Sequence, residues 1–419
     1  MSKSPEELYK EREKRFNDAV ELKEPDRVPL APLTGFFPMA YAGYSFRDGM
    51  YDYEKMVDAW EKATVDFQWD MIPPPFVMFP GPVFEALGVT QMKIPGRDLP
   101  ANRSYQFVEG EYMKADEYDE LLTDPSDFII RKFFPRISKT LSFCAGLPPI
   151  RSLASCYTLV MSGPMVAATP DFLNALESLK TAGQELMKWL AAQNRITTEL
   201  GAQGFPLLCQ AMAQAPFDWI SDFLRGMRGT MLDMYRHPEE LLKAMELFTP
   251  ILVEGATQLA RLTGIPRVFV PLHRGAAGFM SNEQFEEFYW PSLKEVLLQL
   301  VNAGLTPMPF FEGDYTPRLE YLRELPKGKV VAHLDRTDIF KAKEVIGDVL
   351  CIKGNVPPWL LCTGTPQQVE EYCRKLIEVV GEGGGYIMDG AVAGIPDEAK
   401  PENVKAMTEA VLKYGMYKR

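Results

Sequence analysis

The sequence has few histidines and lacks any segment that could cross or target a membrane. Only 3 of its 419 residues are His, so imidazole chemistry is confined to His237, His273 and His333. No apolar run reaches the roughly 20 residues that a membrane-spanning helix needs. The charged start MSKSPEELYKEREKRF carries no apolar signal segment. We therefore expect a cytoplasmic protein that does not bind membranes.

Paired cysteines and an excess of basic residues are also missing. None of the 6 cysteines stands in a C-x-x-C pair, which argues against a disulfide framework or a zinc-ribbon site and favours a reduced compartment. Acidic residues number 57 against 45 basic ones, and a net charge of −12 excludes a protein that coats nucleic acid. The apolar fraction of 46% and the charged fraction of 24% are ordinary for a globular protein.

Short apolar runs alternate with amphipathic helices from about residue 200 onward. Each run ends in a polar or Gly/Pro turn, and a helical stretch such as 281–304 or 365–383 follows. Runs that are apolar on both faces and alternate with helices indicate a parallel sheet. The expected strands are 204–210, 267–273, 306–312, 329–335, 348–354 and 385–390.

The N-terminal half offers three more candidate strands, at 27–34, 69–76 and 155–163. Nine candidates are one more than a (β/α)8 barrel needs, so one of these three is expected to be an extra hairpin strand or a loop. We predict an α/β fold, a TIM barrel that forms a single domain over 1–419, with an N-terminal helical extension at 1–26 and long loop insertions. An open doubly wound sheet is the alternative, but no G-x-G-x-x-G motif follows an early strand.

Polar residues end the predicted strands, where a parallel barrel carries its active site. They are His273, Glu312, His333, Asp335, Asn355 and Asp389. Glu312 and His333 lie 21 residues apart, and His333 and Asn355 lie 22 apart, which is the length of one strand–helix unit. We therefore expect neighbouring strands to present these side chains at one rim of the barrel.

Two of these residues could bind a metal. A carboxylate that follows three apolar residues, as Glu312 does, is partly desolvated and needs a cation, a metal or a proton nearby. We assign Glu312 and His333 as ligands of a zinc ion, although an exposed loop glutamate and a hydrogen-bonded core histidine are the alternatives. The third ligand stays open among His273, Asp335, Cys351 and Asp389, of which we assign Asp335 and Asp389 to ligation or proton handling.

Segments rich in Pro, Met and aromatic residues, at 34–46 and 69–82, are typical either of core packing or of the walls of an apolar pocket. We predict that His273, Trp69 and Phe310 line a substrate pocket.

The segment 210–241 carries further candidates. Arg225 and Arg228 either bind an anionic group or pair with Asp218 and Asp222. His237 precedes a proline and is expected at a helix start.

Several stretches of the chain resemble the uroporphyrinogen decarboxylase superfamily. They are DRVPLAPL near the start, APFDWISDFLRG and GFMSNEQFEEFYWPSLKEVL in the middle, and CIKGNVPPWLLCTGTPQQVEEYCRKLIE and AKPENVKAM near the end. The resemblance covers most of the chain and implies a TIM barrel, in agreement with the strand pattern.

Two activities of that superfamily fit this sequence poorly. The decarboxylases carry an R-Q-A-G-R-type substrate segment after the first strand, but the corresponding stretch TGFFPMAYAG has no arginine, which disfavours decarboxylation of a tetracarboxylate porphyrinogen. The thiol methyltransferases bind zinc through H-x-C and a later Cys. Here Phe310 and Glu312 stand at the H-x-C positions, and Ala393 lies near the later Cys position.

The sequence is more similar to the corrinoid-dependent methyltransferases that demethylate aryl methyl ethers. Their zinc pattern is E-x14-E-x20-H, and the spacing from Glu312 to His333 matches its second half. The first Glu is absent, because position 297 is Leu, and the nearest candidate, Glu295, lies in a predicted helix. The segments 105–121 and 310–322 also resemble this subgroup.

The resemblance implies the methyltransferase component of an O-demethylase system. Such a protein moves a methyl group from a methoxylated aromatic compound to the cobalt of a separate corrinoid protein, with zinc as a Lewis acid on the ether oxygen. The chain lacks the D-x-H-x-x-G corrinoid-binding motif, so the cobalt must arrive on that partner protein. A decarboxylase and a catalytically inactive barrel that binds a corrinoid protein are the alternatives, and a homodimer is left open.

Overall fold

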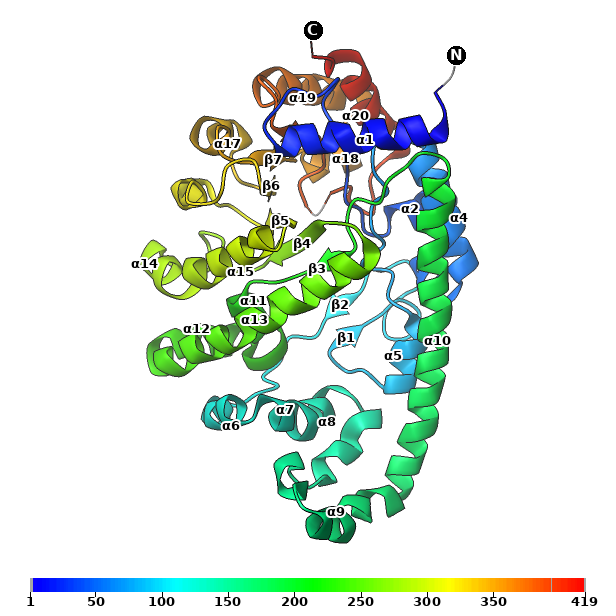
Figure 1. Ribbon diagram of the computed structural model, residues 1–419. Coiled ribbons are helices and arrows are strands. Elements are labelled where there is room, and N and C mark those ends of the chain that lie inside the picture. The colour runs from blue at the N-terminus through cyan, green and yellow to red at the C-terminus, as the bar shows by residue number, and fades with distance from the viewer. Residues whose placement is uncertain (1–2, 393, 418–419) are drawn as a thin grey trace.

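The computed structural model describes residues 3–392 and 394–417, and its centre is a parallel sheet of six strands in chain order (Figure 1). The strands are β3 (Ala211–Met212), β4 (Arg267–Leu272), β5 (Thr306–Phe311), β6 (Val331–Leu334), β7 (Cys351–Lys353) and β8 (Tyr386–Ile387). Five of them lie within the strands expected after residue 200. The sixth, β3, follows directly after the expected strand 204–210.

Two extended segments of the N-terminal half continue the backbone pairing between β8 and β3. Leu30 forms a parallel bridge with Met388, and Ile72 forms one with Leu207. The amide of Asp70 donates to the carbonyl of Leu30 at 2.7 Å, which links the two segments. Together with the six strands, they provide the eight parallel segments of a TIM barrel.

The third candidate of the N-terminal half, 155–163, is helical rather than extended. It forms α9 (Cys156–Ser162) and the start of the 3-10 helix η5 (Gly163–Ala168). Ser155 caps α9 by accepting a hydrogen bond from the amide of Thr158 at 3.2 Å. The expectation of a strand, hairpin strand or loop there was therefore wrong.

The N-terminal extension closes one end of the barrel. Helix α1 (Pro5–Val20) begins with a capping box at Ser4, and its residues Phe16, Ala19 and Val20 pack in one buried cluster with interior residues of the strands. The guanidinium of Arg267 on β4 reaches Glu13 of α1 at 2.8 Å. Within the helical extension predicted for 1–26, the end of α1 is thus packed into the barrel core.

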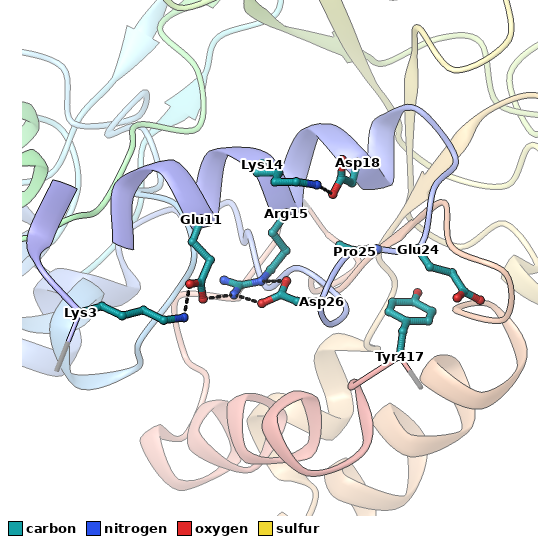
Figure 2. A pocket seen from close by; sticks show the side chains of 9 residues that line it. All are labelled: Lys3, Glu11, Lys14, Arg15, Asp18, Glu24, Pro25, Asp26 and Tyr417. Atoms are coloured by element: carbon teal, nitrogen blue, oxygen red, sulfur yellow. Dashed lines mark hydrogen bonds and ion pairs between the residues drawn. The ribbon is translucent and has the colours of Figure 1, made fainter. Parts of the chain in front are cut away.

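A charged pocket of about 370 Å³ lies between α1 and the last residues of the chain (Figure 2). Arg15 pairs there with Glu11 at 2.8 Å and with Asp26, and it reaches the fully buried Asp70 at 2.6 Å. Figure 2 shows Lys14 turned toward Asp18 and Lys3 toward Glu11. Because these charges neutralise one another and fix α1 to the barrel, we assign the pocket a structural role.

A long insertion joins the second and third segments of the barrel and forms a lobe at its side (Figure 1). It ends in α10 (Pro170–Gly201), the longest helix described. Its other elements are α5 (Gly81–Leu87), the antiparallel pair β1 (Met92–Lys93) and β2 (Gln106–Phe107), η1 (Ala115–Glu117), α6 (Tyr118–Thr123), α7 (Pro125–Phe128), η2 (Ile129–Phe133), α8 (Phe134–Ile137), η3 (Thr140–Gly146), η4 (Ile150–Leu153), α9 and η5.

The remaining helices surround the strands. Before the insertion they are α2 (Phe37–Ala42), α3 (Phe46–Tyr51) and α4 (Tyr53–Asp66). After it they are α11 (Pro216–Trp219), η6 (Ile220–Arg225), α12 (Gly226–Arg236), α13 (Pro238–Thr263), α14 (Asn282–Gln284), η7 (Phe285–Tyr289), α15 (Trp290–Asn302), η8 (Thr316–Arg318), α16 (Leu319–Leu322), α17 (Ile339–Ile346), α18 (Pro358–Thr363), α19 (Pro366–Val379) and α20 (Pro401–Tyr414). His237 precedes α13, which confirms its place at a helix start. Among the described residues, no helix is long and apolar enough to cross a membrane.

Candidate active site at the barrel rim

The alternation of side chains along the strands decides which predicted site residues point into the barrel. Phe310 on β5 and Val331 on β6 belong to the buried cluster inside it. Side chains two residues apart share a face of a strand, so Glu312 follows Phe310, and His333 and Asp335 follow Val331. The register pairs Phe310 with His333. Glu312 and Asp335 therefore lie at the rim, and His333 lies one layer deeper.

His273, at the end of β4, is held by two carboxylates. Its Nδ1 lies 2.5 Å from Oδ2 of Asp222, and its backbone amide donates to Oδ2 of Asp218 at 2.8 Å. Burial alone lowers the pKa of His273, but the hydrogen bond and charge of Asp222, together with Asp218 and Glu312, outweigh it and raise this pKa to about 9. His273 is therefore an imidazolium at neutral pH, and 33% of its side chain is exposed at the rim.

The two carboxylates come from the helical segment after β3, in α11 and the π-helical turn η6. Asp218 is fully buried and accepts hydrogen bonds from the hydroxyl of Tyr289 at 2.7 Å and the amide of Arg274 at 3.0 Å. The guanidinium of Arg274 reaches Asp222 at 3.0 Å. Burial raises the pKa of Asp218 to about 6 although His273 opposes it. π-Helical turns are frequent at functional sites.

Sequence reasoning missed this carboxylate pair. Its signal was the four-residue spacing of Asp218 and Asp222, which places both on one helix face directly after a strand. The sequence leaves open a pairing of Arg225 with Asp218 and Asp222, but Arg225 pairs with Asp233 at 2.6 Å and with Glu111. Arg274 occupies the place beside Asp222 instead.

The charges of His273 and Asp335 act on Glu312 in opposite directions. Desolvation raises the pKa of Glu312, His273 lowers it, and Asp335 raises it, so that the net shift is upward. Burial also raises the pKa of Asp335, whose Oδ2 accepts a hydrogen bond from the amide of Gly313 at 2.8 Å. Two acidic groups with raised pKa values thus lie at the rim near one cationic group.

His333 is 1% exposed and its ring is engaged inside the barrel. Nε2 lies 3.2 Å from the carbonyl oxygen of Gly390 and 3.4 Å from Oδ2 of Asp389. The ammonium of Lys353 forms a buried ion pair with the same Oδ2. Burial and the charge of Lys353 lower the pKa of His333 well below its usual range, which leaves the ring neutral. Phe310, 3% exposed, packs on this ring in a tilted arrangement at a centroid distance of 4.8 Å.

These contacts do not form the three-ligand set that a catalytic zinc needs. Within residues 3–392 and 394–417, no three His, Cys, Asp or Glu side chains are grouped so that they could hold a metal ion. The Nε2 of His333 already faces a carbonyl and a carboxylate, and that carboxylate already neutralises Lys353. The zinc ligation by Glu312 and His333 stays a prediction from the sequence.

A pocket of about 470 Å³ opens beside Asp335, above β6 to β8. The amide of Asn355 donates to the carbonyls of Asp335 at 2.8 Å and Thr337 at 3.1 Å, so its Oδ1 is left to accept. Oδ1 of Asn355 and Oδ1 of Asp335 are buried without a hydrogen-bond partner in the described part of the chain. Apolar and aromatic side chains form the walls, among them Ile339, Phe340, Pro357, Trp359 and Tyr372. Such a pocket suits a ring that carries O–H or N–H donors.

Of the predicted pocket and catalytic residues, the structure brings His273, Glu312 and Asp335 to the rim. Asp389 lies below them, fully buried against Lys353. Trp69 is not brought to the site, because it is fully buried in the main core, where its ring stacks on Phe67 at 5.5 Å.

A family model described as "Uroporphyrinogen decarboxylase (URO-D)" matches residues 159–414. The chain belongs to the uroporphyrinogen decarboxylase family. This confirms the superfamily that the sequence resembles, and the parallel strands of the structure agree with its barrel.

Relatives within the uroporphyrinogen decarboxylase family are distant. The uroporphyrinogen decarboxylase of Methylococcus capsulatus is 32% identical over 119 residues, which are 28% of this chain and 33% of that protein. That of Shewanella amazonensis is 24% identical over 335 residues, 77% of this chain and 91% of that protein. The chain thus matches only about a third of the length of the former.

The fold is also that of a methyltransferase from Methanosarcina mazei. The two structures superpose with a TM-score of 0.62 over 96% of this chain and 98% of the other, at 16% sequence identity. At this identity the similarity concerns the fold.

Proposed function

We propose that the chain is a methyltransferase that takes a methyl group from a methoxylated aromatic compound and passes it to the cobalt of a separate corrinoid protein. Membership of the uroporphyrinogen decarboxylase family and the fold shared with the methyltransferase from Methanosarcina mazei support a methyltransferase-like member of this family. The observation that carries the proposal is the imidazolium of His273, which two carboxylates hold at the end of β4.

The charge of the rim favours an uncharged methyl donor over a porphyrinogen. Five carboxyl groups gather near the mouth: Asp218, Asp222, Glu312, Asp335 and, beside the amide of Phe36, Asp397. The cations at these strand ends are already paired, since His273 and Arg274 lie against Asp222 and Arg336 lies 3.6 Å from Asp335. A substrate with several carboxylates would meet like charges there, which cost free energy unless cations compensate them.

Methyl transfer from an aryl ether needs a proton at the departing oxygen. The C–O bond breaks, its electron pair stays on oxygen, and the phenolate that leaves is a poor leaving group unless it is protonated. Asp222 binds Nδ1 of His273 at 2.5 Å, so the free Nε2–H of the imidazolium is the proton donor. The reduced cobalt of the partner protein supplies the electron pair that captures the methyl group.

The pocket beside Asp335 positions the ring. The free acceptors of Asp335 and Asn355 take hydrogen bonds from its hydroxyl substituents, and the side chains of Phe340, Trp359 and Tyr372 pack on its faces. The binding energy of these contacts would hold the methyl carbon of the ether in line with the incoming cobalt.

The test is a demethylation assay with a reduced corrinoid protein and a panel of methoxyphenols, in which the phenol product is quantified by mass spectrometry. We expect phenol formation that depends on the corrinoid protein. His273→Gln should lower the rate about 10²- to 10⁴-fold, as loss of a general acid does. His237→Gln, in the turn between α12 and α13, should not.

Equal rates for His273→Gln and the wild type would contradict the role of His273. Decarboxylation of a porphyrinogen without any corrinoid protein would contradict the proposed activity and favour the decarboxylase. Tight binding of the corrinoid protein without turnover of any donor would favour an inactive binding barrel.

A further inference from the structure

One face of the insertion lobe is apolar and uncovered. On α10 the exposed fractions lie between 37% and 66% for Leu173, Leu176, Leu179, Leu186, Met187 and Leu190. On the adjoining α9 and η5 they lie between 54% and 80% for Tyr157, Leu159, Val160, Met161 and Met165. Figure 1 shows α10 along the outer edge of the molecule, with α9 at its end. We call these eleven side chains the α9–α10 face.

The α9–α10 face is distinct from the face by which α10 packs on its own chain. Ala175, Ala182 and Ile196, which are spaced by seven residues or a multiple of seven, are buried against the rest of the chain. A helix that covers one apolar stripe normally exposes a polar one. Helix α10 instead carries a second apolar stripe beside the first, and nothing in the described part of the chain covers it.

The size of this face is that of an interface. Eleven large side chains that are each more than a third exposed present apolar area on the order of 1,000 Å², whereas the largest patch on a monomer is about 300–600 Å². A standard protein interface buries about 800 Å² on each partner. The exposed area therefore suffices for a stable complex.

Two pairs of apolar side chains on α10 are placed symmetrically about Gly183. Leu176 and Leu190 lie seven residues before and after it, and Leu179 and Met187 lie four residues before and after it. A Cβ added at Gly183 would meet no atom within 4 Å, so the centre of the stripe is open and flat. A two-fold symmetric interface requires such a self-complementary surface, and a small residue at the crossing lets two helices approach closely.

Charges beside the stripe do not oppose pairing of two chains that each carry −12. Lys180 lies 3.4 Å from Glu177, and Lys188 lies 2.6 Å from Glu185, so acids and bases balance along the helix. We propose that the α9–α10 face is a homodimer interface, in which α10 packs antiparallel against α10 of a second copy and crosses it at Gly183. This inference does not rest on the proposed methyl transfer.

The first test measures the mass in solution by light scattering during gel filtration. We expect the wild-type chain at twice 47.3 kDa and Leu176→Glu/Leu190→Glu at 47.3 kDa with an unchanged circular dichroism spectrum. The matched control is Asn174→Glu/Thr181→Glu, which adds the same charge at exposed positions on another side of α10 and should remain dimeric. A monomeric wild-type chain, or a dimer that survives Leu176→Glu/Leu190→Glu, would overturn the proposal.

The second test locates the crossing by disulfide formation. In a Cys156→Ser background, which removes an exposed thiol, Gly183→Cys should form a covalent dimer on mild oxidation. Leu173→Cys lies ten residues from the crossing, so two copies would stand about 30 Å apart in an antiparallel pair and should not cross-link. Cross-linking at 173 but not at 183 would refute the antiparallel arrangement.

Discussion

Asp222→Asn should release the proton of His273 at physiological pH. Asn keeps the size and a hydrogen-bonding oxygen of Asp222 but removes the charge that lies 2.5 Å from Nδ1. Because burial lowers the pKa of His273 and the carboxylates raise it to about 9, loss of the largest upward contribution should bring this pKa toward its ordinary 6.5.

The effect on protonation is large at pH 8. With a pKa of about 9, about nine-tenths of His273 is imidazolium, and with a pKa near 6.5 only about 3% is, a roughly 30-fold difference. Asp218 and Glu312 retain part of the upward shift, so we expect a tenfold to 30-fold loss of imidazolium and of demethylation rate at pH 8, with little loss at pH 6. The same pKa shift stabilises the fold fully below about pH 6.5, and this stabilisation is lost as the pH rises through 9.

Nuclear magnetic resonance of histidine ring carbons measures this directly, since 3 histidines give at most three signals to assign. His273→Gln identifies the signal, and His237→Gln serves as the control assignment. A His273 signal that titrates near pH 9 in the wild type and at least 2 pH units lower in Asp222→Asn would agree with the reasoning. A titration of His273 near 6.5 in both proteins would refute it.

Other predictions concern the neighbours of His273 and the barrel interior. Glu312→Gln should move the alkaline limit of activity to lower pH, but by less than Asp222→Asn does. The reason is that Glu312 contributes less than Asp222 to the raised pKa of His273. A larger shift of the limit in Glu312→Gln than in Asp222→Asn would contradict this. Lys353→Met should lower the free energy of unfolding by about 3–5 kcal/mol in urea titrations, because it leaves Asp389 buried without its cation. The double variant Lys353→Met/Asp389→Asn should recover most of this loss. A loss below about 1 kcal/mol for Lys353→Met would show that the ion pair is not buried. Because Nε2 of His333 already contacts Gly390 and Asp389, we expect the purified chain to bind less than one zinc ion per molecule. One zinc ion per molecule that is lost in Glu312→Ala would instead support the zinc site predicted from the sequence.

The alternation of runs and helices predicted the barrel, and strand ends predicted much of its rim. His273, Glu312 and Asp335 could be placed there because a parallel sheet brings the carboxyl ends of its strands to one edge. The depth of His333 could not be predicted from spacing alone. It depends on the register of β5 and β6, which sets His333 opposite Phe310, one layer below Glu312.

Other features arise only from tertiary contacts. Asp218 and Asp222 reach His273 from a helix some 50 residues earlier in the chain, through a π-helical turn that a pattern of 3.6 residues does not reveal. The run 155–163 has the apolar side chains that are typical of a buried strand, but it is helical and these side chains are exposed. These exposed side chains belong to the α9–α10 face. The same apolar residues therefore explain both the incorrect strand prediction and the proposed interface.

The absorbance of the corrinoid protein tests the proposed methyl transfer most directly. The chain, the cobalt(I) form of the corrinoid protein and a methoxyphenol are mixed without oxygen, and the spectrum is followed together with the phenol released. We predict that the cobalt(I) band decays into that of methyl-cobalt, with one phenol formed per methyl group, and that His273→Gln slows both. A corrinoid spectrum that stays unchanged with every methoxyphenol, while the chain is folded, would contradict the proposed function.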